Sequence, residues 1–425
     1  MKLIGIRIAA LTTSAALLAA GCSVGAGEDR TELTFWSWAP NIDQVVEIWN
    51  AEHPDVHVTV SKQAAGDELV TKLLTASGAG NPPDLAQVEY QALPNLASNG
   101  ALADISGYVG DLGENFADGV WQQVTLGTDA VYGVPQDAAP MMLYYRQDLF
   151  AEHGLQVPTT WEEFGEVARQ VRQIDPDAYL TTFSSTDPGA FAGLTQQAGA
   201  EWWSIEGESW RIGVDDEATV KVAEFWDQLV TEDAVDDVPM FTPEWNSGMG
   251  NGTYWSWPSA VWAPGNLASI AADNAGDWAA APLPQWEGTA PATGSWGGSS
   301  TGVMAGSEHQ AEAAEFAAWL NTDPVAVSAL VEQAGIYPAD QAAQQALEEP
   351  PAYFSNQPDY YELASEVADT TAGVTWGPNV NVAYNAFKDA FGSAITRRTP
   401  FADAARAMQD AVFRNMADDG FSVNQ

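Results

Sequence analysis

Apolar and polar positions alternate along the first hundred residues with two different periods, which predicts strands and helices in turn. The period of two that is typical of strands occurs in Glu32–Trp38, and Val56–Val60 and Leu85–Val88 are also predicted to be strands. Between them, Ile42–Trp49 and Leu69–Leu74 place apolar residues at helical spacing. The order strand, helix, strand, helix, strand predicts a parallel sheet with helices on its faces.

The next stretch, Tyr132–Trp161, predicts a strand that turns at Pro135 and a second strand over Met141–Tyr145. The second strand is an unbroken apolar run, which is typical of a strand buried on both faces. A short helix follows and ends at Gly154, where glycine tolerates the left-handed conformation. Thr160 and Glu163 then have the spacing of a capping box, which predicts the start of another helix.

The rest of the chain contains further helices, a strand and one segment dense in aromatic residues. The aromatic segment, Thr253–Pro264, is predicted to be a loop. Thr399 is predicted to cap the last helix, with Pro400 at its first position, and Asn41 with Gln44 to cap the first. The predicted helices are Trp161–Ile174, Phe191–Trp203, Glu217–Val230, Glu312–Asn321, Leu363–Asp369, Val382–Phe391 and Pro400–Met416, and the strand is Trp278–Pro284.

The N-terminus has the features of a bacterial export signal. Lys2 and Arg7 precede the apolar run Ile8–Ala20, which is too short to span a bilayer. Small residues lead to Cys22, and Leu18–Cys22 resembles a lipobox. We therefore expect a signal peptide over residues 1–21, lipid on Cys22 and a tether over 22–31, so that the protein is anchored on the extracytoplasmic face of the cell membrane. The alternative is an ordinary secretory signal with an incidental cysteine.

Composition excludes several classes of function. The 58 acidic residues outnumber the 15 basic ones and give a formal net charge of −43, which excludes sequence-independent binding of nucleic acid. Attraction to anionic lipid is disfavoured for the same reason, so contact with the membrane is expected through the lipid anchor only. With one cysteine and four scattered histidines, no disulfide and no metal site are predicted, and nothing in the sequence requires a cofactor.

Aromatic residues give the main chemical signal. Many of the 18 tryptophans stand beside Gly, Pro or Ser, at predicted strand ends or loops. Indole rings stack on the C–H faces of sugars, and carboxylates accept hydrogen bonds from sugar hydroxyls. Packing within the fold is the alternative for any single tryptophan, and exposure to solvent for any single acid. The tryptophans so placed are Trp36, Trp38, Trp255, Trp257, Trp262, Trp296 and Trp376, and the best-placed acids are Glu89 and Asp137.

One apparent catalytic motif is rejected. Gly298–Gly302 matches the pattern G-x-S-x-G of a nucleophile elbow, which needs an acid and then a histidine further along the chain. The only later histidine is His309, and no Asp lies between. Gly298 is more simply explained by close approach of the backbone to a ligand. The chain is therefore not expected to be an enzyme.

Two stretches resemble the family 1 extracellular solute-binding proteins, the sugar-capturing subunits of ABC importers. They are YGVPQDAAPMMLYYRQDLFAEHGLQVPTTW at 132–161 and KLLTASGAGNPPDLAQVEYQALPNLASNGALADIS at 72–106. The likeness extends over residues 32–416 and is looser in the last hundred. It implies an α/β fold of two lobes, each a mainly parallel sheet flanked by helices, joined by a hinge of several strands.

The resemblance also implies the division of the chain and its partners. The first lobe is expected to hold residues 32–134 with 285–322, and the second 135–284 with 323–425, with crossings near Pro135, Pro284 and Asp323. A monomer would capture a mono- or oligosaccharide and deliver it to permease subunits. The expected ligand contacts are Trp36, Trp38, Glu89, Asp137, Trp257, Trp262, Trp296, Gly298 and Trp376.

Two alternatives stay open at this point. A secreted glycoside hydrolase would also be acidic and rich in tryptophan, and it would need two carboxylates across one bond. A binding protein for a non-sugar solute such as a polyol is the other. The 15 basic residues are too few and too scattered to favour a phosphate ligand.

Overall fold

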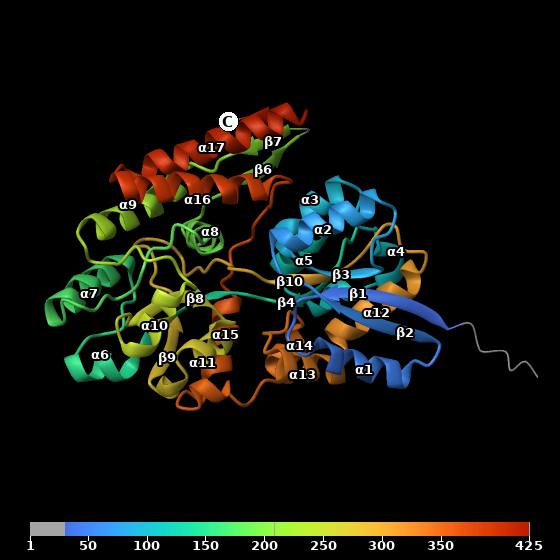
Figure 1. Ribbon diagram of the computed structural model, residues 1–425, viewed down its shortest axis with the longest axis horizontal. Coiled ribbons are helices and arrows are strands. Elements are labelled where there is room, and N and C mark those ends of the chain that lie inside the picture. The colour runs from blue at the N-terminus through green and yellow to red at the C-terminus, as the bar shows by residue number, and fades with distance from the viewer. Residues whose placement is uncertain (1–29, 208, 425) are drawn as a thin grey trace, which may run out of the picture.

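The computed structural model describes residues 30–207 and 209–424, and these form two lobes side by side (Figure 1). The first lobe holds β1–β4, β10, α1–α5 and α12–α14, and the second holds the other elements. The predicted signal peptide (1–21), the lipidated Cys22 and most of the tether (22–31) lie outside the described residues.

The chain alternates strands and helices along its length. The strands are β1 Thr31–Ser37, β2 Val56–Lys62, β3 Leu85–Glu89, β4 Val134–Asp137, β5 Met141–Arg146, β6 Trp203–Glu206, β7 Ser209–Ile212, β8 Ser256–Ala260, β9 Trp278–Pro282, β10 Ser299–Val303 and β11 Val423–Asn424. The α-helices are α1 Ile42–Glu52, α2 Asp67–Gly78, α3 Leu93–Ser98, α4 Ser106–Val109, α5 Asp118–Thr125, α6 Gln147–His153, α7 Trp161–Ile174, α8 Pro188–Gln197, α9 Glu217–Thr231, α10 Pro243–Asn251, α11 Ala263–Ile270, α12 Gln310–Thr322, α13 Pro324–Ala329, α14 Gln341–Gln345, α15 Tyr360–Ala368, α16 Val380–Arg397 and α17 Phe401–Asp418.

The first lobe is built on a five-stranded sheet in the order β2-β1-β3-β10-β4. β1 is parallel to β2 and to β3, as the sequence predicts. β10 enters from far along the chain and lies antiparallel between β3 and β4. α2, α3 and α5 cover one face of this sheet, and α1 and α12 cover the other (Figure 1).

The central sheet of the second lobe, in the order β8-β5-β9, is antiparallel, which corrects the expected mainly parallel one. β5 lies in the middle and pairs antiparallel with β8 and with β9. The same lobe has a second three-stranded sheet in the order β11-β7-β6. Met141–Tyr144 of β5 are buried, as expected for a central strand, and the hydroxyls of Tyr144 and Tyr360 lie 2.9 Å apart. β8 lies within the segment predicted to be an aromatic loop. Ser256–Ala260 is fully buried strand, because packing against β5 outweighs the weak strand signal of its Pro258.

Two apolar cores form, and they do not match the two lobes one to one. The smaller core lies under α1 and α12, where Trp49 and Phe316 pack edge to face with ring centroids 5.3 Å apart. The larger core begins at Leu69 and Leu73 of α2, on the other face of the first sheet, and continues into the second lobe. The lobes therefore share apolar packing where the chain crosses between them.

Several predicted helix ends are confirmed, and others lie at different residues in the structure. Thr160 and Glu163 form the capping box, and Gly154 ends α6 in the left-handed conformation. The side chain of Asn41 caps nothing in α1 and donates instead to the carbonyl of Gln333. The N-cap of α17 is Pro400 rather than Thr399. α8 ends at Gln197, before the tryptophan pair that opens β6.

The crossings between the lobes also differ from the prediction. β4 continues through Pro135 without a turn, and the first crossing lies at Ala138–Pro140. Residues 285–293 stay with the second lobe, since Trp286 packs 5.5 Å from Phe225. The second crossing is therefore at Ser295–Gly298, where Ser295 pairs with Pro140. Its chain then becomes β10.

The third crossing comes later than Asp323. Val327 and Leu330 belong to the smaller core, and α13 packs on α12 and α1. Residues 323–345 therefore belong to the first lobe, and the chain crosses between α14 and α15. The sequence predicts a crossing at Asp323-Pro324. In the structure these two residues instead start α13, because the side chain of Asp323 caps the helix.

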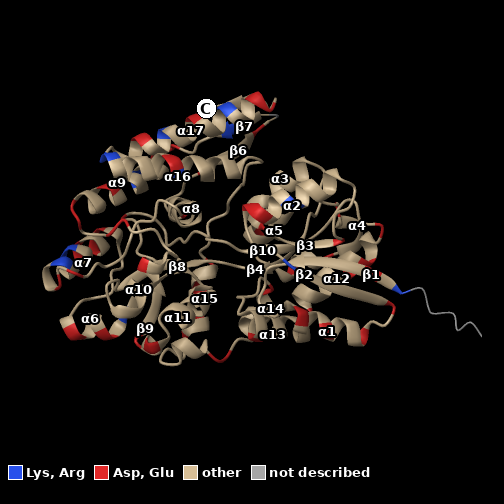
Figure 2. Cartoon of the chain, viewed as in Figure 1, with Lys and Arg blue, Asp and Glu red and all other residues tan. Residues whose placement is uncertain are grey.

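Acidic side chains are spread over both lobes in Figure 2. The described part of the first lobe has only three basic residues, Arg30, Lys62 and Lys72. Most of the described Lys and Arg residues therefore lie on the second lobe, and the first lobe is strongly acidic. None of the helices in residues 30–207 and 209–424 combines the length and the hydropathy needed to cross a bilayer.

Removing the hydroxyl of Thr160 should destabilise the protein by about 0.5–2 kcal/mol, because the N–H of Glu163 loses its capping acceptor. Urea denaturation of Thr160→Ala measures the loss. Thr71→Ala is the control, since the hydroxyl of Thr71 only bonds a carbonyl of its own helix. Equal stability of the Thr160 variant and the wild type would contradict a role for the capping box.

Candidate functional site

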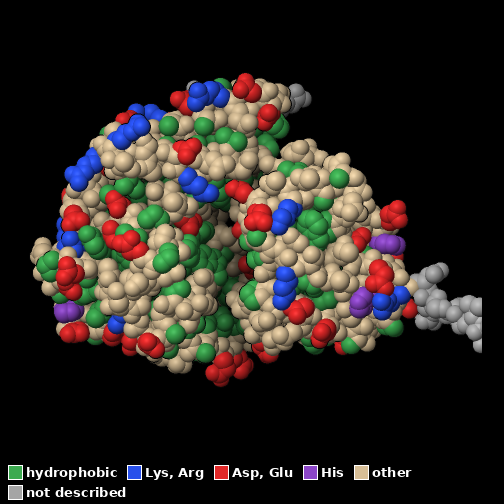
Figure 3. Space-filling model, in the orientation of Figure 1, with side chains coloured by type: hydrophobic (Ala, Val, Ile, Leu, Met, Phe, Trp, Pro, Cys, Tyr) green, Lys and Arg blue, Asp and Glu red, His purple; other side chains and the backbone are tan. Residues whose placement is uncertain are grey.

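A cleft of about 380 Å³ opens between the two lobes (Figure 3). The first lobe lines it from the start of α2 and from the segment after β3. The second lobe lines it from the start of α8, from the second crossing and from one face of α16. Its lining residues are Gly66, Asp67, Val70, Glu89, Gln91, Ala92, Asn95, Thr186, Asp187, Pro188, Gly189, Trp262, Trp296, Gly297, Val380, Asn381, Tyr384 and Lys388.

Three carboxyl groups face this space, and Lys388 is the one basic residue among the lining residues. Burial, and then the charges of Asp67, Asp137 and Asp187, raise the pKa of Glu89 to about 7. Burial also raises the pKa of Asp187 to about 6, although the Ala190 N–H and Lys388 act in the opposite direction. The cleft thus gathers hydrogen-bond acceptors that have few donors of their own.

Two indole rings form the aromatic wall of the cleft. Trp262 and Trp296 meet edge to face with their centroids 4.8 Å apart, and the Trp262 indole N–H donates to the Trp296 carbonyl at 2.7 Å. The second crossing beside them contains Gly297 and Gly298, with φ of 92° and 88°. At Gly298 a β-carbon would lie 2.8 Å from the ring of Tyr90, so only glycine fits both the conformation and the space.

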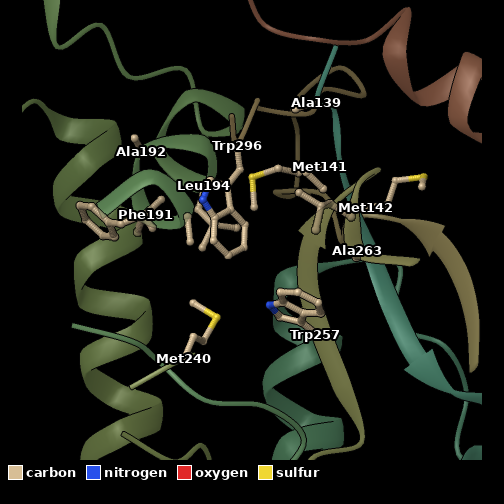
Figure 4. Packing of buried hydrophobic residues seen from close by; sticks show 14 of the residues in the cluster. Ala139, Met141, Met142, Phe191, Ala192, Leu194, Met240, Trp257, Ala263 and Trp296 are labelled. Carbon is tan, nitrogen blue, oxygen red and sulfur yellow. The ribbon is translucent and has the colours of Figure 1, made fainter. Parts of the chain in front are cut away.

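The structure brings three of the nine predicted contacts together in the cleft and places the other six outside its lining. Glu89, Trp262 and Trp296 all line the cleft. Trp257 does not, because its side chain is 1% exposed in the core of the second lobe. Figure 4 shows it beside Met240, below Trp296. The structure thus places Trp257 in the core rather than at the cleft, because a tryptophan before proline can also belong to a buried strand.

Asp137 and Gly298 serve the structure next to the cleft. The Ser299 hydroxyl donates to the Asp137 carboxylate and accepts from the amide of Gln87 at 3.0 Å. Burial raises the pKa of Asp137 to about 6, against the opposing effect of Ser299. The carbonyl of Gly298 accepts from the backbone N–H of Tyr90. Neither residue is among those that line the cleft.

The remaining three tryptophans also lie away from the lining. Trp36 and Trp38 lie in the first lobe and are half-buried against the larger of the two apolar cores. Trp376 is 9% exposed, and its indole N–H donates to the side chain of Gln123 at 3.2 Å. Because Gln123 belongs to the first lobe and Trp376 to the segment before α16, this bond joins the two lobes.

The sequence reasoning missed most of the polar groups of the cleft. Asp187 could have been found, since Asp-Pro marks the start of α8. Tyr384 and Lys388 are four residues apart on one face of α16. Which face of α16 meets the cleft depends on the third crossing, and no periodicity in the sequence gives that. Burial raises the pKa of Tyr384 well above its usual range, with further effects from Glu89, Asp187 and Asp67.

In the described ranges, no group of three or more His, Cys, Asp and Glu side chains is placed to hold a metal ion. The cleft offers aromatic faces, carboxylates, amides and one ammonium group. Such a set can bind a polar molecule that has apolar faces and many hydroxyls.

Comparison with known proteins identifies the family. The family model of the bacterial extracellular solute-binding proteins matches residues 36–327. The chain belongs to this family. Family members bind solutes and are not enzymes, which supports the sequence-based prediction. It also removes the glycoside hydrolase alternative.

Relatives and solved structures agree with this assignment. An arabinooligosaccharide-binding protein of Halalkalibacterium halodurans is 26% identical over 69% of this chain and 67% of its own. A lactose-binding protein of Rhizobium radiobacter is 26% identical over 95% and 97%. The galacto-N-biose-/lacto-N-biose I-binding protein of a Bifidobacterium longum ABC transporter, solved with lacto-N-biose, has a TM-score of 0.85 and 25% identity over 93% of this chain and 99% of its own. The two-lobe periplasmic-binding-protein fold is thereby confirmed.

Replacing Glu89 by glutamine should weaken the dependence of stability on pH. The folded protein raises the Glu89 pKa from 4.5 to about 7, so between these values the folded state holds a proton that the unfolded state has lost. Stability of the wild type therefore falls as the pH rises through this window and stays lower above it. Chemical denaturation should show Glu89→Gln gaining about 1–3 kcal/mol over the wild type between about pH 4.5 and pH 8.

The matched control is Glu47→Gln, an exposed carboxylate on α1 outside the cleft. It should follow the wild type at each pH. A wild-type pH profile in Glu89→Gln would show that the carboxyl group is not held in the protonated form.

Proposed function

We propose that this protein captures an oligosaccharide outside the cell and delivers it to the permease subunits of an ABC importer. The observation that carries the proposal is the pairing, in one cleft between two lobes, of the Trp262 and Trp296 rings with the Glu89 and Asp187 carboxyl groups. Relatives named for binding arabinooligosaccharide, lactose and lacto-N-biose support the ligand class.

The division of labour within the cleft follows from the chemistry of sugars. A pyranose presents C–H groups on its faces, which pack on an indole, and hydroxyls at its edges. Glu89 and Asp187 lie on opposite lobes, so a sugar held between them can donate hydroxyl hydrogens to both. A flexible linear polyol has hydroxyls but no rigid face, so it would leave the indole rings unused.

Because both lobes contact the cleft, ligand binding can change the arrangement of the lobes, and a permease can recognise that change. A ligand that bridges Glu89 on the first lobe and Trp262 on the second stabilises a closed arrangement over an open one. The shared core and the interlobe bond from Trp376 to Gln123 limit how far the lobes separate. We infer a hinge motion about the crossings and a monomer as the working unit.

The lipid anchor is a separate part of the proposal and rests on the sequence before residue 30. Lys2, the short apolar run and the small residues before Cys22 support cleavage and lipid attachment at Cys22. We expect mass spectrometry of protein from the native envelope to find an N-terminal diacylglyceryl-cysteine. An unmodified N-terminus at another residue would end this part of the proposal and leave sugar binding untouched.

Truncating Trp262 should weaken sugar binding while the fold is retained. A thermal-shift screen with lactose, lacto-N-biose and arabinooligosaccharides first selects the best ligand, because a ligand of the folded state raises the melting temperature. Calorimetric titration should then show that Trp262→Ala costs about 1–4 kcal/mol of binding free energy, the range of strong interface anchors.

Trp257→Ala is the matched control, since Trp257 packs against Trp262 at 5.6 Å but is buried. It should lower the free energy of unfolding by about 3–5 kcal/mol, the cost of a large cavity. Full affinity in Trp262→Ala would contradict the assignment of the aromatic wall. A screen in which no sugar raises the melting temperature would count against the ligand class itself.

A further inference from the structure

Phe241 combines two properties that rarely occur together in a bulky apolar residue. Its side chain is 43% exposed, and its backbone lies in the left-handed region with φ of 64°. A positive φ is a genuine outlier for a bulky residue. The segments on either side fix this conformation, since the Met240 N–H donates to Ser184 and Thr242 caps α10. Strained positions of this kind cluster at ligand-contacting sites.

The ring of Phe241 lies next to the two indole rings of the aromatic wall. Its centroid lies 6.2 Å from that of Trp296 and 6.5 Å from that of Trp262, both of which line the cleft. It also lies 5.3 Å from Trp245 and 5.9 Å from Trp257, which are buried behind it. Figure 4 shows its neighbour Met240 close to Trp257 and below Trp296. One side of the ring is therefore supported by the core, and the other is open.

A purely structural role explains these facts less well. A hydrophobic residue just before an N-cap often packs on the fourth residue of the helix as a staple. In α10 that fourth residue is Asn246, which offers no apolar partner, and the ring packs on Trp245 instead. Glycine would adopt the φ of Phe241 without strain. The fold alone therefore does not favour phenylalanine at this position.

We propose that Phe241 is the aromatic surface of a second sugar subsite, beyond the ring that occupies the cleft against Trp262 and Trp296. The proposal rests on the proposed function and deepens it, because it makes an oligosaccharide of at least two rings the preferred ligand. A sugar face can stack on an aromatic ring that is packed on one side and open on the other. Because the packing already holds the Phe241 side chain in place, it loses little conformational entropy when ligand binds.

The test separates the ring from the backbone strain. Phe241→Ala removes the ring and keeps the β-carbon, Phe241→Gly removes both, and Phe241→Tyr keeps an aromatic ring. The control is Tyr108→Ala, an aromatic residue 53% exposed on α4. Each protein is titrated with lactose, lacto-N-biose and galactose by calorimetry, and its melting temperature is measured without sugar.

The alanine and glycine variants should bind the disaccharides about 10-fold more weakly or worse, while affinity for galactose changes less than about twofold. Phe241→Tyr and Tyr108→Ala should keep the disaccharide affinity. Without sugar, Phe241→Gly should melt about 1–3 °C higher than Phe241→Ala, because both lack the ring and only alanine keeps the backbone strain. Together these results would establish a second subsite that contributes binding at the expense of stability.

Disaccharide affinity within twofold of the wild type in Phe241→Ala would overturn the proposal. So would an equal loss for galactose, since that places the ring in the first subsite. If the wild type itself binds none of these sugars, the proposed function fails for them. The second subsite then fails with it, whereas disaccharide binding by the wild type that Phe241→Ala retains in full refutes the subsite alone.

Discussion

A chain of buried hydrogen bonds holds the crossing strands to the first lobe. The Ser37 hydroxyl donates to Gln87, the Gln87 amide donates to Ser299, and Ser299 donates to Asp137. These side chains come from β1, β3, β10 and β4, so three of the four neighbouring pairs of strands in this sheet are tied. Because a buried polar group without a partner is costly, the four side chains fix one another. Glu89, at the end of β3, lines the cleft, so this wall of the cleft is held in place by the same strands.

The electrostatics of the cleft follow from the same arrangement. Glu89 ends β3 next to the tied strands, and Asp187 approaches it from the start of α8 in the second lobe. Neither carboxyl group has a basic partner within a salt bridge in the described structure. Burying a carboxyl group without a partner costs free energy in the protein without ligand. A ligand that donates hydroxyl hydrogens to these groups recovers part of that cost.

The sequence predicted well where one periodicity dominates. The parallel strands β1–β3, the buried β5 and the capping box at Thr160 all lie in such segments. It failed where tertiary packing decides, as in Ser256–Ala260, which β5 recruits into a sheet despite Pro258. For the site, residues just after a strand were found, such as Glu89. Residues on α8 and α16 were not, because only the three crossings bring those helices to the cleft.

The position of β10 has a consequence for how this chain acquires its structure. β3 and β4 do not pair with each other, since Ser299–Val303 lies between them. Before Ser299–Val303 have been synthesised, β3 and β4 each have an edge without a hydrogen-bonded neighbour, although more than half of the chain has already been made. Open edges of this kind invite association with other chains. The first lobe to begin folding is thus unable to finish before most of the second has been made, and export must deliver the chain across the membrane without letting these edges meet a partner.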